Sequence, residues 1–312
     1  MDELRGNLEV EKADAGAGIR TRAVSLEGTP LKKVFHPQKQ LSNRELEEYL
    51  TLLEIQGLSE GWIYRVKRAL IKYLDSIGWE ITKPKTLDYL KQRKNELKTS
   101  SFRKDTYQIL KLLGYLKMPW AGDIQPPAEP HYTPKRVGKE DILETIEYFR
   151  NDKYFKRFKA LVLLGATSGM RAEELYQLTP DDIDIEERMI RVNHDPDNGQ
   201  TTKTKQSRIT FFNTEAQQAL VEYLDFFNNG SELEKLFSKF PMERAFKDAP
   251  IYVKDLRKFF SQQWDRQGGA TSIKKVLMGH SLNGDVDLTH YNSQSERDLK
   301  GIYDDVGIKI TM

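Results

Sequence analysis

The hydrophobic positions along the chain predict a helical domain over residues 41–118. Leu46, Leu50 and Leu53 recur at intervals of three and four residues, a spacing that places side chains on one face of an α-helix. The polar residues between them would face solvent. Four segments share this period: 46–53, 63–77, 87–97 and 107–116.

Two segments around this domain lack any sustained period. Residues 1–40 are rich in Gly, Ala and charged side chains, so we expect a flexible N-terminal tail there. Residues 119–136 concentrate prolines, which remove backbone donors and end helices and strands. We interpret this stretch as a linker between two domains. Its prolines are Pro119, Pro126, Pro127, Pro130 and Pro134.

The remaining residues, 137–312, predict a larger domain that is helical apart from one β-hairpin, with a tail at its C-terminal end. The segments 189–192 and 208–212 are rich in β-branched and aromatic residues and read as strands, and Asp197-Asn198-Gly199 between them is typical of a hairpin turn. The fold class is therefore mainly α with a small β-hairpin or sheet, in two domains. Helices are predicted over 155–165, 172–178, 220–227 and 256–264.

Composition narrows the class of protein. Hydrophobic residues make up 38% of the 312 residues, which is enough for packed cores and excludes wholesale disorder. No apolar run approaches the roughly 20 residues that cross a bilayer, and no signal-peptide pattern is present. The absence of cysteine excludes disulfides, Cys–zinc sites and thiol catalysis. We expect a cytoplasmic protein with no membrane partner.

The net charge of +2 hides an uneven distribution. Residues 60–117 hold 14 Lys/Arg and 6 Asp/Glu, whereas the rest of the chain is slightly acidic. A basic block of this kind indicates a phosphate-backbone partner, although a solvated helical face would look the same. The candidate DNA-binding residues are Arg65, Lys67, Arg68, Lys72, Arg103 and Lys104, with Lys205 from the predicted hairpin.

Motifs for nucleotides, metals and serine hydrolysis are missing. The sequence has no phosphate-binding glycine loop, no His-Glu-x-x-His and no Gly-x-Ser-x-Gly. Asp285, Asp287 and His290 could be drawn as a metal cluster, but a polar turn between helices explains them more simply. We therefore expect neither a cofactor nor a metal.

Basic residues stand out at four places in the larger domain. Gly169 interrupts one predicted helix, and Arg171 begins the next with Glu174 on the same face, where it can orient the guanidinium. Lys203 and Lys205 lie between the two predicted strands, at a hairpin tip that could enter a groove. Lys254 and Arg257 share one helix face, and Gly279-His280-Ser281 precedes Tyr291.

In this order the motifs resemble the catalytic domain of the tyrosine recombinases, the phage-integrase family. The resemblance covers residues 137–305. The hairpin lysine of the family precedes a strand arginine by five residues, which selects Lys203 before Arg208 and leaves Lys205 in reserve. The other matches are Ser168–Leu175 to the first arginine motif, Lys254–Arg257 to His-x-Leu-Arg, Gly279–Ser281 to Gly-His-Ser, and Tyr291 to the nucleophile.

The resemblance implies a two-domain clamp on DNA, with a helical core-binding domain at 41–118 and a catalytic domain at 137–312. It also implies transesterification at a phosphodiester without metal, because fixed cations neutralise the phosphate. The implied catalytic residues are Arg171, Lys203, Lys254, Arg257, His280 and Tyr291, with Glu174 in support. In these roles Arg171 and Arg257 clamp the phosphate, Lys203 protonates the leaving oxygen and His280 donates a hydrogen bond.

Three points stay open on the sequence. Lys254 stands where most members have histidine, a replacement similar to the integrases of archaeal viruses and plasmids, so its role is proton transfer or phosphate binding. Tyr303 is a rival nucleophile to Tyr291, although it suits a packed C-terminal helix better. Residues 292–312 are either an arm that docks on a neighbouring copy or a segment that packs on its own domain.

The function expected from the resemblance is site-specific DNA recombination through a 3′-phosphotyrosine intermediate, integrating or excising a mobile genetic element such as a viral genome. The partners would be double-stranded DNA attachment sites, bound in the host cell by a homotetramer on paired sites that forms from monomers in solution. Two alternatives remain: a type IB topoisomerase-like nicking and rejoining enzyme, and a non-catalytic DNA-binding protein of the same fold.

Overall fold

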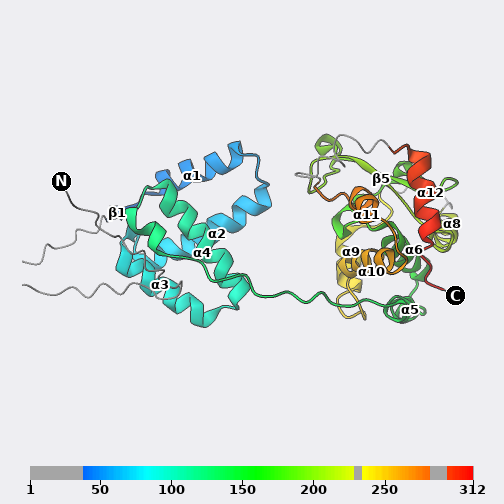
Figure 1. The fold of residues 1–312 in the computed structure, drawn as a ribbon, viewed down its shortest axis with the longest axis horizontal. Coiled ribbons are helices and arrows are strands. Elements are labelled where there is room, and N and C mark those ends of the chain that lie inside the picture. The colour runs from blue at the N-terminus through cyan, green and yellow to red at the C-terminus, as the bar shows by residue number, and fades with distance from the viewer. Residues whose placement is uncertain (1–37, 228–233, 282–293, 312) are drawn as a thin grey trace, which may run out of the picture. The chain divides into compact units, whose positions relative to one another are not determined.

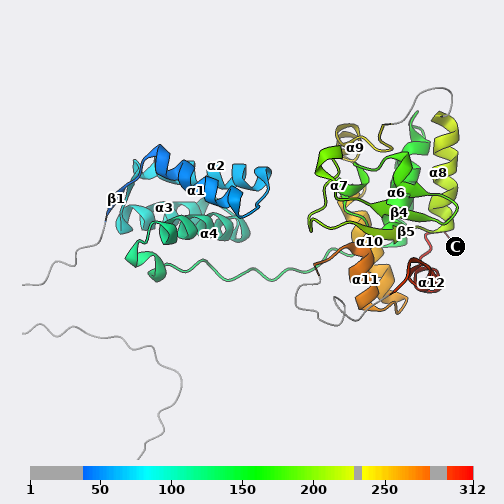
Figure 2. The same ribbon diagram turned by 90° about the horizontal axis from the view of Figure 1, so that it is seen from above.

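The computed structural model describes residues 38–227, 234–281 and 294–311. The chain divides into two compact units, 1–132 and 133–312. Figures 1 and 2 show both units, the first built from helices alone apart from one short ladder and the second from helices around a small sheet. Each unit has its own hydrophobic core.

The described part of unit 1 contains four α-helices. α2 is its centre, because it contacts α1, α3 and α4 and buries Leu70, Tyr73 and Leu74 completely. The hydroxyl of Tyr73 shares a hydrogen bond of 2.7 Å with Thr86, so the one polar atom of this core side chain is satisfied. The helices are α1 (Asn43–Ile55), α2 (Glu60–Ile77), α3 (Lys83–Glu96) and α4 (Thr99–Tyr115).

The edges of unit 1 differ from the predicted boundaries. β1 (Lys39–Gln40) pairs with β2 (Glu80–Ile81), so the last residues of the expected tail belong to the folded unit. The 3-10 helix η1 (Pro119–Asp123) buries Trp120 in the core of unit 1. Proline is well tolerated in the first turn of a helix, so Pro119 begins this helix rather than the linker. The expected linker starts several residues later.

Unit 2 contains a three-stranded antiparallel sheet in the order β3-β4-β5. The predicted hairpin is β4 with β5, in a register that pairs Met189 with Phe211 and Val192 with Arg208. β3 is an additional edge strand that the sequence pattern did not predict. The strands are β3 (Ile183–Asp184), β4 (Met189–Val192) and β5 (Arg208–Phe211).

Helix α6 is the centre of unit 2. Its residues 160–168 are all buried, and it contacts α5, α8, α10 and the sheet. Figure 2 shows α6 beside α8, α10 and strands β4 and β5. The predicted second helix is only α7, because the chain leaves helical geometry after Leu175. The helices are α5 (Lys139–Tyr148), α6 (Phe155–Ser168), α7 (Ala172–Leu175), α8 (Thr214–Phe227), α9 (Lys239–Ala245), α10 (Val253–Arg266), α11 (Thr271–Met278) and α12 (Glu296–Val306).

The described part of the C-terminal segment packs on its own domain. Tyr303 of α12 lies in the core of unit 2, and its hydroxyl donates a 2.8 Å hydrogen bond to the carbonyl of Thr167. The backbone N–H groups of Ile310 and Thr311 donate to the carboxylate of Glu215 at the start of α8. These contacts tie the segment to the domain that carries it.

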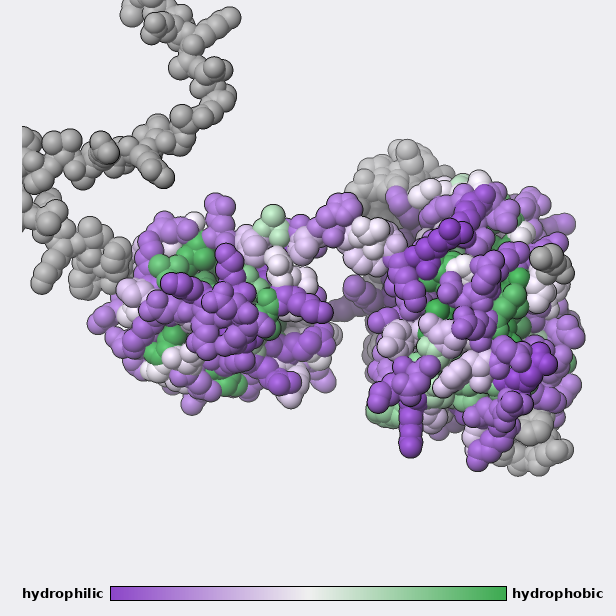
Figure 3. Space-filling view, turned by 90° about the horizontal axis from the view of Figure 1, so that it is seen from below, coloured by the Kyte–Doolittle hydropathy of each residue, from purple (hydrophilic) through white to green (hydrophobic). Residues whose placement is uncertain are grey.

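The surface seen in Figure 3 is mostly hydrophilic on both units, with hydrophobic residues in scattered patches. Within the described ranges, no helix is long and apolar enough to cross a membrane.

Candidate active site

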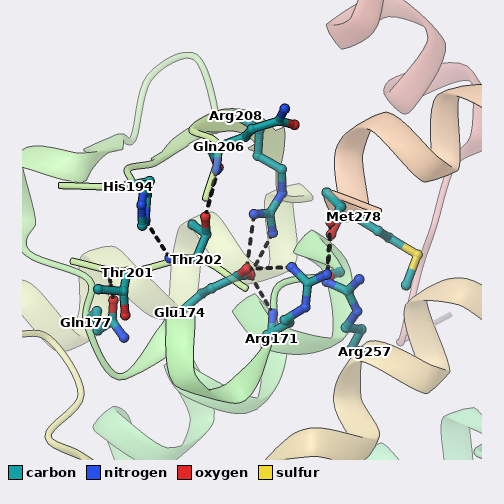
Figure 4. Close-up of polar contacts among 12 residues, drawn as sticks. Arg171, Glu174, Gln177, His194, Thr201, Thr202, Gln206, Arg208, Arg257 and Met278 are labelled. Atoms are coloured by element: carbon teal, nitrogen blue, oxygen red, sulfur yellow. Dashed lines mark hydrogen bonds and ion pairs between the residues drawn. The ribbon is translucent and has the colours of Figure 1, made fainter. Parts of the chain in front are cut away.

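Two arginines pair with one buried carboxylate in unit 2, and a third arginine from another element lies beside them (Figure 4). Arg171 Nη1 lies 2.8 Å from Glu174 Oε1, and Arg208 Nη2 lies 2.6 Å from Glu174 Oε2. Arg257 of α10 reaches the same place and donates to the carbonyl of Gly169, 2.8 Å away. Sequence positions 88 residues apart thus meet around the turn between α6 and α7.

The sequence builds this turn locally. Gly169 ends α6 with φ of +67°, a left-handed conformation that glycine adopts without strain. Arg171 then has extended backbone at the start of α7, and its N–H donates to Glu174 Oε2 at 2.8 Å. Glu174 therefore fixes both the backbone and the guanidinium of Arg171.

Strand β5 delivers Arg208 to the same turn. Residues two apart on a strand point to the same side of the sheet, so Arg208 and Thr210 face the turn together. Thr210 Oγ1 donates to the carbonyl of Ser168 at 2.7 Å and anchors the strand against the end of α6.

The three guanidiniums also hold the C-terminal end of α11. Arg208 Nε donates to the carbonyl of Leu277, Arg257 Nη1 to Met278, and Arg171 Nη2 to Gly279, at 2.8–2.9 Å. These carbonyls lie at the negative end of the helix, where cations are favoured. His280 follows directly, so its place is set by the arginine cluster.

Arg257 has donors left for a ligand. Within the described residues, both of its hydrogen bonds use Nη1, which leaves Nε and Nη2 unused. Burial and the neighbouring charge of Arg171 lower the pKa of Arg257 to about 10, which still leaves it cationic at neutral pH. Three guanidiniums against one carboxylate give a local excess of positive charge, which suits a phosphate.

The pKa values of Glu174 and His280 follow from the same cluster. Burial alone would raise the pKa of Glu174, but the hydrogen bonds and charge of Arg208, and then those of Arg171, hold it below its usual value. Partial desolvation, together with the charges of Arg257 and Arg171, lowers the pKa of His280. The same cluster thus favours the ionised form of Glu174 and the neutral form of His280.

The candidate lysines are exposed on unit 2, and no hydrogen bond or ion pair between described residues joins Lys203 or Lys254 to the arginine cluster. Lys203 and Lys205 are exposed in the loop between β4 and β5. Lys254 is exposed at the start of α10, with its ammonium 4.9 Å from the centre of the Tyr252 ring. It shares a helix face with Arg257, as the spacing predicted.

Of the two candidate tyrosines, only Tyr303 lies in the described part of the chain. Burial raises the pKa of Tyr303 well above its usual range, and its hydroxyl is occupied by Thr167. A phenol so placed cannot reach DNA. Tyr291 lies outside the described residues, as do Asp285, Asp287 and His290.

The candidate DNA-binding residues of unit 1 fall into two groups. Arg65, Arg68 and Lys72 are exposed at intervals of three and four residues on one face of α2, and Lys104 is exposed on α4. Lys67 and Arg103 also have partners within the unit. Lys67 pairs with Glu47 of α1 at 2.6 Å, and Arg103 donates to the carbonyl of Pro127.

Arg208 is the site residue that the sequence reasoning missed, because it served there only to locate Lys203. Its side chain is 8% exposed and makes more contacts in the cluster than Lys203 does. The sequence signal was its place two residues before Thr210 in a predicted strand of otherwise apolar residues, which puts both side chains on one side of the sheet. Among the described residues, no group of three or more His, Cys, Asp or Glu could hold a metal ion.

Sequence comparison places this arrangement in a known class. Residues 135–283 match the model of the phage integrase family. Tyrosine recombinase XerA of Pyrococcus furiosus is 30% identical over 50% of this chain and 54% of its own length. Tyrosine recombinase XerA of Thermococcus onnurineus is 26% identical over 79% of this chain and 84% of its own. The chain belongs to the tyrosine recombinases, the phage integrase family.

Two solved structures share the fold at low identity. A lambda integrase dimer bound to a core site has a TM-score of 0.57 at 14% identity, covering 86% of this chain and 97% of that one. The Tn1549 transposon integrase with transposon right-end DNA has a TM-score of 0.54 at 16% identity, covering 82% and 98%. Both are mainly helical recombinase folds like this one.

Proposed function

We propose that this protein is a site-specific DNA recombinase that cuts and rejoins strands through a 3′-phosphotyrosine intermediate, integrating or excising a mobile genetic element. The observation that carries the proposal is the cluster of Arg171, Arg208 and Arg257 around Glu174 next to His280. Its excess positive charge and unused donors suit a phosphodiester, and family membership adds the reaction class.

In the proposed reaction the tyrosine oxygen of Tyr291 bonds to phosphorus and the bond to the 5′ oxygen breaks. Arg171 and Arg257 neutralise the non-bridging oxygens, and His280 donates a hydrogen bond to one of them. Lys203 gives a proton to the leaving 5′ oxygen, and the phenol proton passes to solvent. Attack by another 5′ hydroxyl reverses the steps, joins the new strand and releases the tyrosine.

The proposed partners are double-stranded attachment sites, brought together by a tetramer in the host cell. Lambda integrase has been solved as a tetramer on a Holliday junction, which supports this assembly. The matches named XerA and XerC favour a second candidate, the resolution of chromosome dimers. Lys254 in place of histidine favours the mobile element, through the resemblance to archaeal viral and plasmid integrases.

A suicide substrate, nicked so that the cleaved strand diffuses away, tests the proposal. The wild-type protein is expected to form a covalent protein–DNA adduct. Tyr291→Phe is expected to form none, whereas Tyr303→Phe should retain the adduct because its hydroxyl is used inside the core. If Tyr291→Phe still forms the adduct, another residue is the nucleophile. If the wild type forms no adduct on any site, the non-catalytic alternative is favoured. Strand exchange between two duplexes separates recombination from topoisomerase-like relaxation.

A further inference from the structure

The loop that carries Lys203 is built around Thr202. This side chain is buried although both of its neighbours are exposed. Thr202 Oγ1 donates to the carbonyl of Gln206 at 3.0 Å and accepts from the N–H of Gln206 at 3.1 Å. The carbonyl of Thr202 accepts from the N–H of Lys205 at 3.1 Å. One threonine therefore closes the tip of the loop with three hydrogen bonds.

His194, at the other side of the loop, fixes this tip to the end of β4. The N–H of Thr202 donates to His194 Nδ1 at 3.1 Å (Figure 4), and the N–H of His194 donates to Ser207 Oγ at 2.9 Å. Hydrogen bonds thus hold the loop before and after Lys203, at Thr202 and at Ser207. Ser207 directly precedes Arg208 of the arginine cluster.

Lys203 itself has no hydrogen bond or ion pair with a described residue, and its side chain is exposed. Its flexible four-carbon stem carries a point charge whose location depends on the backbone beneath it. A proton donor must come within hydrogen-bond reach of the leaving oxygen, so the backbone of this loop decides whether Lys203 can act.

We propose that Thr202 and His194 are positioning residues that hold the loop so that Lys203 can protonate the leaving 5′ oxygen. The inference rests on the proposed function, in which Lys203 is the general acid. Thr202 touches neither DNA nor the reacting atoms in this role. It acts through the hydrogen bonds that keep residues 202–206 closed.

The chemistry of the leaving group provides a selective test. With an ordinary strand, the bond from phosphorus to the 5′ oxygen breaks and that oxygen needs a proton. With a 5′-bridging phosphorothiolate, the bond from phosphorus to sulfur breaks instead. The sulfur leaves as a thiolate without a proton, because thiols are far stronger acids than alcohols. A defect confined to proton delivery therefore disappears with sulfur, and a defect in phosphate binding or folding does not.

The experiment measures the rate of adduct formation by the full-length protein on oxygen and sulfur suicide substrates. Thr202→Val keeps the shape of the side chain and removes its hydroxyl, and His194→Ala removes the ring acceptor. Each is expected to be slower by about 10-fold or more on oxygen, since general acids contribute about 100-fold or more, and close to wild type on sulfur. Lys203→Ala should behave in the same way with a larger defect.

Two controls fix the interpretation. Thr202→Ser keeps the hydroxyl and should behave like the wild type on both substrates. Asn198→Ala breaks the 2.6 Å hydrogen bond to Asp195 in the neighbouring turn of the same loop and should show no difference between oxygen and sulfur.

Several results would overturn the inference. Thr202→Val and His194→Ala could match the wild type on oxygen, or they could be equally slow on both substrates while Lys203→Ala recovers on sulfur. In either case the loop contacts do not position the acid, but the proposed function stands. If Lys203→Ala also fails to recover on sulfur, the assignment of the acid is wrong and the inference falls with it.

Discussion

Glu174 and Arg208 form a buried ion pair that joins the α6–α7 turn to strand β5. Arg208 Nη2 lies 2.6 Å from Glu174 Oε2 and Nη1 lies 3.1 Å from Oε1, a two-pronged contact in which both side chains are less than a tenth exposed. The same carboxylate holds Arg171. The proposed phosphate clamp is thus built on a carboxylate that carries no proposed chemical role of its own.

Replacing Glu174 tests this arrangement. Glu174→Gln leaves the buried guanidinium of Arg208 and the partly buried one of Arg171 without a counter-charge, so we expect unit 2 to lose about 3–5 kcal/mol of stability. Adduct formation should fall as well, because Arg171 loses the group that orients it. Urea unfolding, with amide exchange in α6 and β5 to report on unit 2, measures the first effect, and the suicide substrate measures the second.

Glu173→Gln is the matched control. Glu173 is the neighbouring residue on α7, but its partner Lys239 and its own side chain are largely exposed. Surface pairs contribute about 0–1 kcal/mol, so this variant should be close to wild type in both measurements. Equal losses in the two variants would mean that the buried carboxylate has no special place in the site.

The lowered pKa of His280 predicts a pH dependence of stability. In the unfolded chain His280 binds a proton at a higher pH than it does in the folded protein. Between the two pKa values folding therefore releases a proton from His280. The contribution of His280 to the free energy of unfolding is fully present above the ordinary histidine pKa of about 6.5. It is lost as the pH falls toward the lower pKa that His280 has in the folded state. Wild-type unit 2 should therefore lose stability on acidification more steeply than His280→Gln.

Urea unfolding at a series of values from about pH 8 to about pH 5 measures this difference. His131→Gln, which changes an exposed histidine of unit 1, should leave the wild-type slope for unit 2 unchanged. Parallel curves for the wild type and His280→Gln would show that His280 takes up its proton equally in both states.

The sequence predicted the arginine motif well because its geometry is local. Gly169, Arg171 and Glu174 lie within six residues, so helix spacing alone places the carboxylate under the guanidinium. The two strands were predicted over 189–192 and 208–212 because both segments carry strong strand preferences. Their pairing is confirmed, and the second strand ends one residue earlier, at Phe211.

Other features depend on contacts between distant segments, and the sequence could not show them. Helix α7 ends at Leu175 instead of Leu178, and the residues after it contact distant segments: the Gln177 side chain accepts from the N–H of Thr201, and the carbonyl of Leu178 accepts from the N–H of Leu236. The loop between β4 and β5 forms two turns where the pattern suggested one hairpin tip. The role of Arg208 appears only once β5 is packed against the end of α6.

The exposed face of α2 predicts the salt dependence of DNA binding. Arg68 and Lys72 lie on this face, and each phosphate contact releases counterions. Arg68→Ala and Lys72→Ala should each weaken binding across sequences and reduce the slope of log K against log salt by about 1. Titrations between about 50 and 200 mM salt measure this slope. Arg68→Lys is the control, since it keeps the positive charge on this face and should leave the slope unchanged.

Gly169 and Gly199 offer a comparison that separates backbone strain from packing. Both have positive φ, +67° and +71°, so an alanine at either position carries a similar strain of about 1–2 kcal/mol. A Cβ at Gly199 would meet nothing within 4 Å, whereas one at Gly169 would lie 2.5 Å from the ring of Phe260. Gly169→Ala should therefore lose about 1–3 kcal/mol more than Gly199→Ala. It should also slow adduct formation, because the carbonyl of Gly169 holds Arg257. For each variant, urea unfolding measures the loss of stability and the suicide substrate measures the rate of adduct formation. Equal losses of stability would mean that the Phe260 ring turns aside at little cost, and the turn that carries Arg171 would then be less tightly packed than the structure shows.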